Sequence, residues 1–122
     1  MRLWYTRPRL MSKIEEIDGA LFAVSKHEGV DTVLLLSAEG LILGGVGAKP
    51  LGGFGAKTVE LAQASSRLLG DTADEIVAAN DVFRVALVRA PRRAWLLCRF
   101  GPSADAGVVI AALRNAADTL AL

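Results

Sequence analysis

The sequence predicts an α+β fold in which helices cover both faces of an antiparallel sheet. Two apolar runs rich in β-branched residues, Val30–Leu36 and Leu41–Leu43, are separated by the turn Ser37–Gly40. Gly40 supplies the positive φ that such a short hairpin needs. The stretch Val33–Leu36 does not alternate with polar residues, so both faces of its strand are expected to meet apolar partners rather than water. Helices must therefore pack on the two sides of the sheet.

The length and composition indicate one domain with apolar surface that a partner subunit covers. At 122 residues, the chain is long enough to bury a core without metals or disulfides. Its hydrophobic content of 52% and mean hydropathy of +0.40 are high for a soluble protein, which indicates a partner subunit. No apolar run approaches the roughly 20 residues that a bilayer-spanning helix requires. The N-terminus also lacks a secretory signal pattern, so we expect a cytoplasmic protein.

The charge distribution argues against nucleic acid as a partner. The net charge is +1, but Arg2, Arg7 and Arg9 all lie in the first eleven residues, which leaves the remainder mildly acidic. Phosphate binding requires lysines and arginines clustered on the domain itself. We therefore expect no nucleic-acid partner.

The first helix is predicted to begin at Ser12. Ser12 and Glu15 have the spacing of a capping box. Apolar residues then recur at three- and four-residue steps: Ile14, Ile17, Leu21 and Val24. The helix is expected to end near His27. Residues 1–11 show no periodic pattern, so we expect a flexible arm or extension before a single domain over residues 12–122.

The segment Gly44–Gly55 has the components of a phosphate-binding loop without the required spacing. A strand, a glycine-rich loop, Lys57 and a helix follow one another. The pattern G-x-x-x-x-G-K-T would need glycines where Leu51 and Ala56 stand, and the pattern G-x-G-x-x-G fails as well. A linker is therefore favoured. A small-ligand or nucleotide-binding sensor that uses this loop is the alternative function.

The predicted helix Thr58–Leu69 is rich in small residues. Leu61 and Leu68 lie on one side of it, whereas much of the rest is alanine and serine. Small residues let a second backbone approach closely. The pattern fits packing against the sheet as well as packing against a second copy in a twofold dimer.

The second half of the chain predicts a meander and a last helix. The strands are expected at Glu75–Ala79, Phe83–Val88 and Trp95–Phe100. A cluster of three arginines at the last turn, Arg89, Arg92 and Arg93, favours a solvated turn over an anion site. Ser103 is expected to be the N-cap of the last helix. That helix carries an apolar stripe: Val109, Leu113, Ala116, Ala117 and Leu120.

The sequence offers no set of residues for catalysis. Its one cysteine, Cys98, lies in an apolar strand pattern and is expected to be a small buried hydrophobe. Its one histidine, His27, lies at a helix C-terminus, where it suits the helix dipole. Neither paired metal-ligand spacing nor a Ser-His-Asp set is present. We therefore expect no enzyme, no metal site and no cofactor.

The first hairpin, GVDTVLLLSAEGLIL, is the most distinctive stretch of the chain. The alanine- and serine-rich helix follows it, and then DEIVAAN, FRVALVRA, AWLLCRF and a final helix. This order, α-β-β-α-β-β-β-α over about residues 12–120, resembles the roadblock/dynein light-chain family, including its bacterial members. The loop Gly44–Gly55 is longer and richer in glycine than that family leads us to expect. Profilin-like and longin-type domains share related layouts.

The resemblance implies a five-stranded antiparallel sheet, with the middle helix on one face and the terminal helices on the other. It also implies a homodimer formed through the middle helix and the following edge strand. Mapped onto this chain, the dimer and partner-binding residues are Thr58, Leu61, Ala62, Ser65, Leu68, Leu69, Ile76, Val77 and Ala78.

The resemblance has functional implications as well. Bacterial members of the family are associated with small Ras-like GTPases, some as GTPase-activating partners. The chain is thereby expected to be a homodimeric adaptor or regulator of such a GTPase, and a purely structural scaffold subunit is a further possibility. No arginine-finger motif is present, so no catalytic residue is carried over.

Overall fold

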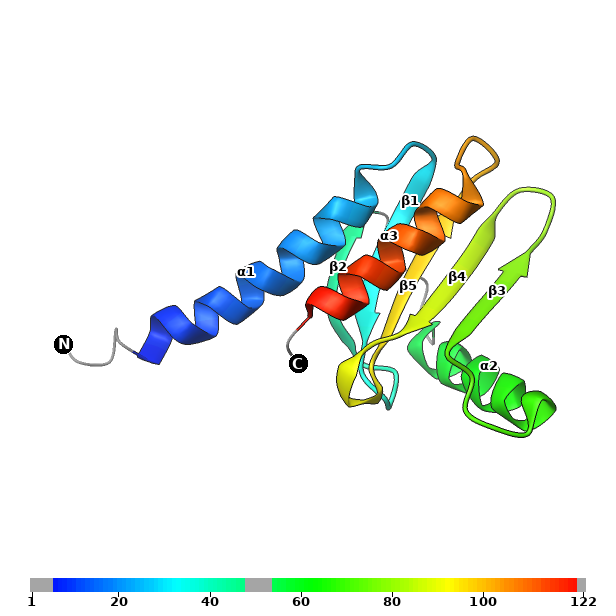
Figure 1. Ribbon diagram of the computed structural model, residues 1–122, viewed down its shortest axis with the longest axis horizontal. Helices are drawn as coiled ribbons and strands as arrows, with labels where there is room; N and C mark the ends of the chain where they lie inside the picture. The colour runs from blue at the N-terminus through cyan, green and yellow to red at the C-terminus, as the bar shows by residue number, and fades with distance from the viewer. Residues whose placement is uncertain (1–5, 48–53, 121–122) are drawn as a thin grey trace.

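The computed structural model describes residues 6–47 and 54–120 of the chain, with side chains from residue 13 onward. The predicted α+β fold is confirmed: three helices surround a five-stranded antiparallel sheet (Figure 1). The elements in chain order are α1 (Thr6–Ser25), β1 (Val30–Leu36), β2 (Ile42–Gly47), α2 (Phe54–Leu69), β3 (Glu75–Ala79), β4 (Arg84–Arg89), the 3-10 turn η2 (Pro91–Arg93), β5 (Trp95–Phe100) and α3 (Ala106–Thr119). The strands lie in the order β2-β1-β5-β4-β3.

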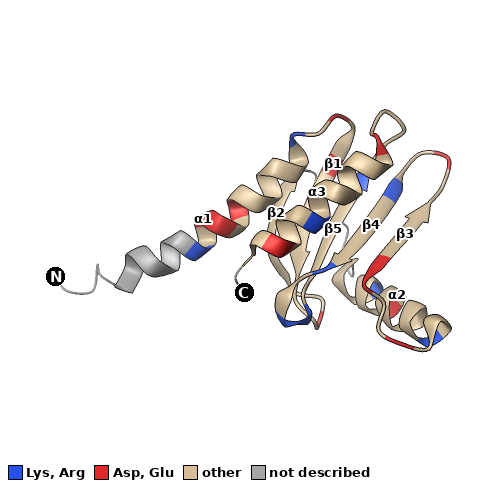
Figure 2. Cartoon of the chain, viewed as in Figure 1, with Lys and Arg blue, Asp and Glu red and all other residues tan. Residues whose placement is uncertain are grey.

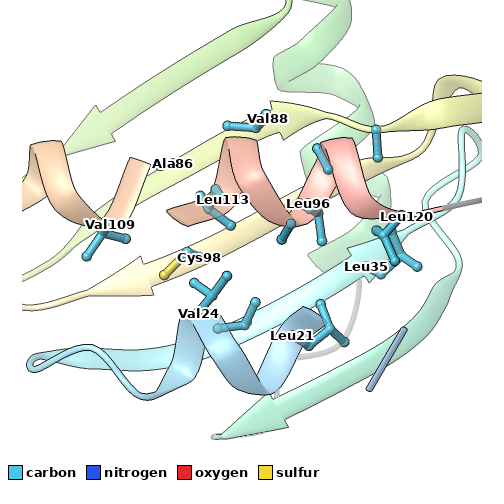
Figure 3. Close-up of a cluster of buried hydrophobic side chains, with 14 of the residues drawn as sticks. Leu21, Val24, Leu35, Ala86, Val88, Leu96, Cys98, Val109, Leu113 and Leu120 are labelled. Atoms are coloured by element: carbon cyan, nitrogen blue, oxygen red, sulfur yellow. The ribbon is translucent and has the colours of Figure 1, made fainter. Parts of the chain in front are cut away.

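One face of the sheet is covered by α1 and α3, which lie side by side (Figure 1). Leu21 of α1 and Leu113 of α3 are fully buried there against alternate residues of the strands, such as Leu35, Leu96 and Cys98. Figure 3 shows these side chains converging between the two helices and the sheet. This cluster is the larger of the two cores.

The other face of the sheet is covered by α2. Leu34, Leu36 and Leu97 point to this side and pack with Ala62 of α2. Neighbouring residues of β1 thus enter different cores, because successive side chains of a strand point to opposite faces. The prediction that both faces of this strand meet apolar partners is confirmed.

The turn between β1 and β2 touches the start of α2. The backbone N–H of Gly40 donates to the Ser37 carbonyl at 3.0 Å, and Gly40 has a φ of 90° as predicted. A Cβ added to Gly40 would lie 2.6 Å from the carbonyl oxygen of Gly55. A Cβ on Gly55 would collide with the Gly40 carbonyl even more severely. Two glycines therefore allow the backbone of α2 to rest directly on the hairpin.

The first helix begins earlier than predicted. It starts at Thr6, so Ser12 lies inside the helix and the predicted cap at Ser12 is wrong. Pro8 does not prevent this start, because the first four N–H groups of a helix have no intrahelical partner. The N-terminal half of α1 projects beyond the sheet (Figure 1). The domain boundary at residue 12 stays a prediction, and residues 1–5 lie outside the described part of the chain.

Three further boundaries differ from the sequence prediction. The second strand runs on to Gly47, through the first residues of the predicted glycine loop. The middle helix begins at Phe54 rather than at Thr58. The last helix is capped by Asp105, whose carboxylate accepts from the backbone N–H of Val108 at 3.2 Å. Serine and aspartate cap helices about equally well, so sequence preference did not separate Ser103 from Asp105.

Cys98 is the small buried residue that the sequence predicted. It is fully buried, and burial, reinforced by the charge of Asp31, raises the pKa of its thiol to about 12. Burial and the raised pKa both disfavour the thiolate, which is the nucleophilic form of cysteine, near neutral pH. The hydrogen bonds from Arg99 to Asp31 hold the pKa of that carboxyl below its usual value.

No helix in the described residues has both the length and the apolar character needed to cross a bilayer.

The Gly40–Gly55 contact is testable with a matched pair of alanine variants. Gly55→Ala should lower the free energy of unfolding by about 1–3 kcal/mol, because the new methyl group overpacks a backbone contact. Gly19→Ala is the control: nothing lies within 4 Å of its added Cβ, and alanine should stabilise the interior of α1 by up to about 1 kcal/mol. Urea unfolding followed by circular dichroism measures both. A Gly55→Ala variant as stable as the wild type would contradict the close approach.

Candidate functional site

The middle helix carries six of the nine predicted partner residues, and β3 carries the other three. Two side chains of the helix anchor it to the sheet. Thr58 is 5% exposed and Ala62 is 6% exposed. The Thr58 hydroxyl donates to the Phe54 carbonyl at 3.0 Å, so its polar group is satisfied within the first turns of the helix. Both residues face the core of this chain rather than its surroundings.

The C-terminal end of α2 is held by Ser66. Its hydroxyl donates to the Ala62 carbonyl at 2.9 Å and accepts from the backbone N–H of Ala73 at 3.0 Å. Ala73 is fully buried, so this N–H would otherwise have no partner. Gly70, with a φ of 75°, ends the helix in the left-handed conformation that glycine adopts readily. The sequence analysis missed Ser66, although a serine four residues after Ala62 is a known pattern for bonding back to the helix.

The outer side of α2 carries leucines that the described part of the chain leaves exposed to different degrees. Leu68 is 89% exposed and Leu69 is 68% exposed, while Leu61 is 37% exposed. Exposed leucines close together on one helix are typical of a surface that meets another protein.

The strand β3 forms one edge of the sheet. It pairs with β4 on one side, and the order of the described strands ends with it on the other. Its Val77 is 49% exposed. An open edge presents unpaired backbone N–H and carbonyl groups that a further strand can bind.

The nine predicted partner residues thus separate into two groups. Thr58 and Ala62 are buried against the sheet, and Ile76 packs half-buried against the same core. Ser65 is half-buried on α2. The exposed members are Leu61, Leu68, Leu69, Val77 and Ala78. We call these five residues the α2–β3 surface.

The described residues do not bring potential metal ligands together. No group of three or more metal-ligating side chains occurs in residues 6–47 and 54–120. Lys57, which the alternative sensor function would use, forms an exposed ion pair with Glu60 at 3.6 Å. Residues 48–53 of the predicted glycine loop lie outside the described residues, so that hypothesis stays a prediction.

Known structures with a similar fold identify the fold of this chain. No protein-family model and no curated protein matches the chain. The structure of the gliding protein MglB from Thermus thermophilus is similar, with a TM-score of 0.79 and 23% identity over 88% of this chain and 87% of that one. A Roadblock/LC7 domain from Streptomyces avermitilis has a TM-score of 0.64 and 18% identity over 85% of this chain and 90% of that one. The chain has the roadblock fold.

The chain is also similar in structure to a profilin, with a lower TM-score than the two structures above. A chain of the LokiProfilin1 complex with rabbit actin has a TM-score of 0.61 and 13% identity over 87% of this chain and 94% of that one. The fold that the sequence suggested is therefore confirmed as roadblock/profilin-like.

The contribution of the Ser66 hydroxyl to the stability of the protein can be measured. Ser66→Ala should lower the free energy of unfolding by about 1–3 kcal/mol, because the buried N–H of Ala73 loses its acceptor. Ser65→Ala, one residue away on the same helix, should change it by less than about 0.5 kcal/mol. Thermal unfolding of both variants checks this. Equal effects of the two substitutions would contradict the role of the Ser66 hydroxyl.

Proposed function

We propose that this roadblock-type domain is a homodimeric regulator of a small Ras-like GTPase. The observation that carries the proposal is the α2–β3 surface, an uncovered apolar helix flank together with an open sheet edge. The fold adds support, because bacterial members of the family that the sequence resembles are associated with such GTPases. We expect the protein to act in the cytoplasm.

The proposed dimer joins two copies through the α2–β3 surface. Pairing of β3 with the same strand of a second copy supplies partners for its unpaired backbone groups. It also covers Leu68 and Leu69, which are the most exposed large hydrophobic side chains among the described residues. Full burial of a leucine contributes about 1.5–3 kcal/mol, and a twofold axis provides that contribution twice. The high hydropathy of the sequence is consistent with this arrangement.

The proposed role is regulation rather than hydrolysis. The thiol of Cys98 is buried and its pKa is raised, and the described residues hold no group of three or more potential metal ligands. Nucleotide hydrolysis therefore belongs to the GTPase partner, and this domain acts by binding it. The domain can change the partner's hydrolysis rate by binding one conformation of the partner more tightly than another. The size of that change is limited by the difference in the domain's affinity for the two conformations.

The dimer is the first part of the proposal to test. Light scattering coupled to size exclusion should find a dimer at micromolar concentration. Leu68→Glu should weaken it by about 2 kcal/mol or more, which is roughly a 30-fold rise in dissociation constant, because a charge enters the apolar contact. Leu41→Glu, at an equally apolar position that is 66% exposed outside the α2–β3 surface, should leave the dimer intact. A monomeric wild-type protein would contradict the proposal.

The GTPase partnership requires a second measurement. The immobilised wild-type protein should retain a Ras-like GTPase from the native extract, and addition of the purified domain should change the rate of GTP hydrolysis by about tenfold or more. Retention with an unchanged hydrolysis rate would identify a scaffold instead of a regulator. Failure to retain any GTPase would overturn the partnership while leaving the dimer result unaffected.

A further inference from the structure

A pocket of about 410 Å³ lies on the flank of α2 that the α2–β3 surface does not use. Its walls come from α2 and the segment after it, from the β1–β2 turn, and from the end of β4, the β4–β5 connection and the start of β5. The side chains that matter to its chemistry are Gln63, Ser66, Arg67, Arg89, Arg93 and Trp95. None of its described lining residues is acidic, so its three arginines have no carboxylate beside them in the lining; the Asp74 carboxylate near Arg89 lies outside it.

Arg89 is fixed in place at the back of this pocket. Its Nε donates to the Ala73 carbonyl at 3.3 Å and lies 3.7 Å from a carboxylate oxygen of Asp74. Its guanidinium also stacks on the ring of Trp95, with 4.8 Å between the guanidinium carbon and the ring centroid. Trp95 is 4% exposed. The positive charge of Arg89 is therefore held rigidly beside an aromatic wall.

The other two arginines are not engaged by acids. Within the described part of the chain, neither Arg67 nor Arg93 forms an ion pair, and both are exposed. They come from different elements, Arg67 from α2 and Arg93 from η2, and the fold brings them to the rim of one pocket. Figure 2 shows basic residues on both α2 and η2.

The backbone of η2 separates its two arginines. Arg92 and Arg93 have φ values of 59° and 62°, in the left-handed region that residues other than glycine rarely adopt. The hydrogen bond from the Ala90 N–H to the Ala94 carbonyl, at 2.8 Å, closes the turn around them. Arg93 lines the pocket, whereas Arg92 lines a different hollow. Strained backbone of this kind tends to occur at functional sites.

We propose that this pocket binds a small ligand through a phosphate group. Guanidinium groups form paired, charge-assisted hydrogen bonds with phosphate oxygens, and three of them match a multiply charged anion better than a single carboxylate. The Gln63 amide adds a neutral donor at the rim. The volume lies within the usual range for small-ligand sites, roughly 300–1,000 Å³. Free phosphate and the phosphates of a nucleotide share this chemistry.

The phosphate site is independent of the proposed dimer. With 100° between successive residues of a helix, the pocket-lining Gln63 and Arg67 lie about 100–160° around α2 from Leu61 and Leu68. A partner that covers Leu61 and Leu68 therefore leaves the flank with Gln63 and Arg67 accessible. Sequence reasoning favoured a solvated turn for the arginines of the meander, because nothing in the sequence placed Arg67 beside them.

Tryptophan fluorescence provides the test. Trp4 is the only other tryptophan in the sequence, so a Trp4→Phe background isolates the signal of Trp95. Phosphate, pyrophosphate and GTP are titrated separately at constant ionic strength, and calorimetry on the same samples detects binding that leaves the fluorescence unchanged. We expect at least one of these probes to saturate at about 1 mM or below.

Matched variants distinguish binding in this pocket from nonspecific attraction of an anion to basic surface charge. Arg67→Gln combined with Arg93→Gln should weaken binding by about tenfold or more, which corresponds to about 1.4 kcal/mol. Arg92→Gln, at the adjacent position of the same turn, should bind like the wild type. All three positions are exposed, so the variants should keep the wild-type circular dichroism spectrum.

Each outcome decides the proposal or the source of the phosphate. Saturation by phosphate or pyrophosphate supports a free anion as the ligand, whereas saturation by GTP alone supports a nucleotide. Stronger binding of citrate than of every phosphate probe would overturn the phosphate assignment. The proposal is also wrong if no probe saturates, or if Arg92→Gln weakens binding as much as the double variant does. None of these results depends on whether a GTPase partner exists.

Discussion

The antiparallel pairing of β1 with β5 is the interaction on which the rest of the structure depends. These two strands lie at the centre of the sheet, and their side chains are buried on both faces. Leu34 opposite Leu97 supports the side under α2, and Val33 opposite Cys98 supports the side under α1 and α3. The two cores therefore share the backbone of these strands.

The same arrangement explains why α2 is free to present two different flanks. Only a narrow stripe of the helix, including Thr58 and Ala62, is buried against the sheet. Its start rests on the backbone of the hairpin, and its end is tied to the following segment by Ser66. A helix held at its two ends and along one stripe needs no further packing. One flank can therefore remain apolar for a partner, and the other can line a basic pocket.

Local patterns predicted most of the fold, and the parts they missed depend on contacts between distant residues. The unbroken apolar run of β1 required cover on both sides, and the structure has it; of the small residues of α2, Ala62 packs in the core beneath the helix. The early start of α1 was missed because residues 1–11 show no periodic apolar pattern and Ser12 with Glu15 has the spacing of a capping box. The pocket was missed for a different reason: no local pattern connects Arg67 with Arg93. The nine partner residues followed from family resemblance, which identified the elements but not which of their side chains are exposed.

The glycine content of β2 has a consequence for how far self-association can extend. This strand forms the other edge of the sheet and contains Gly44, Gly45 and Gly47, the last with a φ of 97°. Glycines weaken a strand, and a left-handed residue bends its end away from regular pairing. The sheet thus has one edge suited to accepting a strand and one that discourages it. Association through β3 would cover the edge that can accept a further strand. Assembly would therefore stop at a dimer instead of continuing into a fibre.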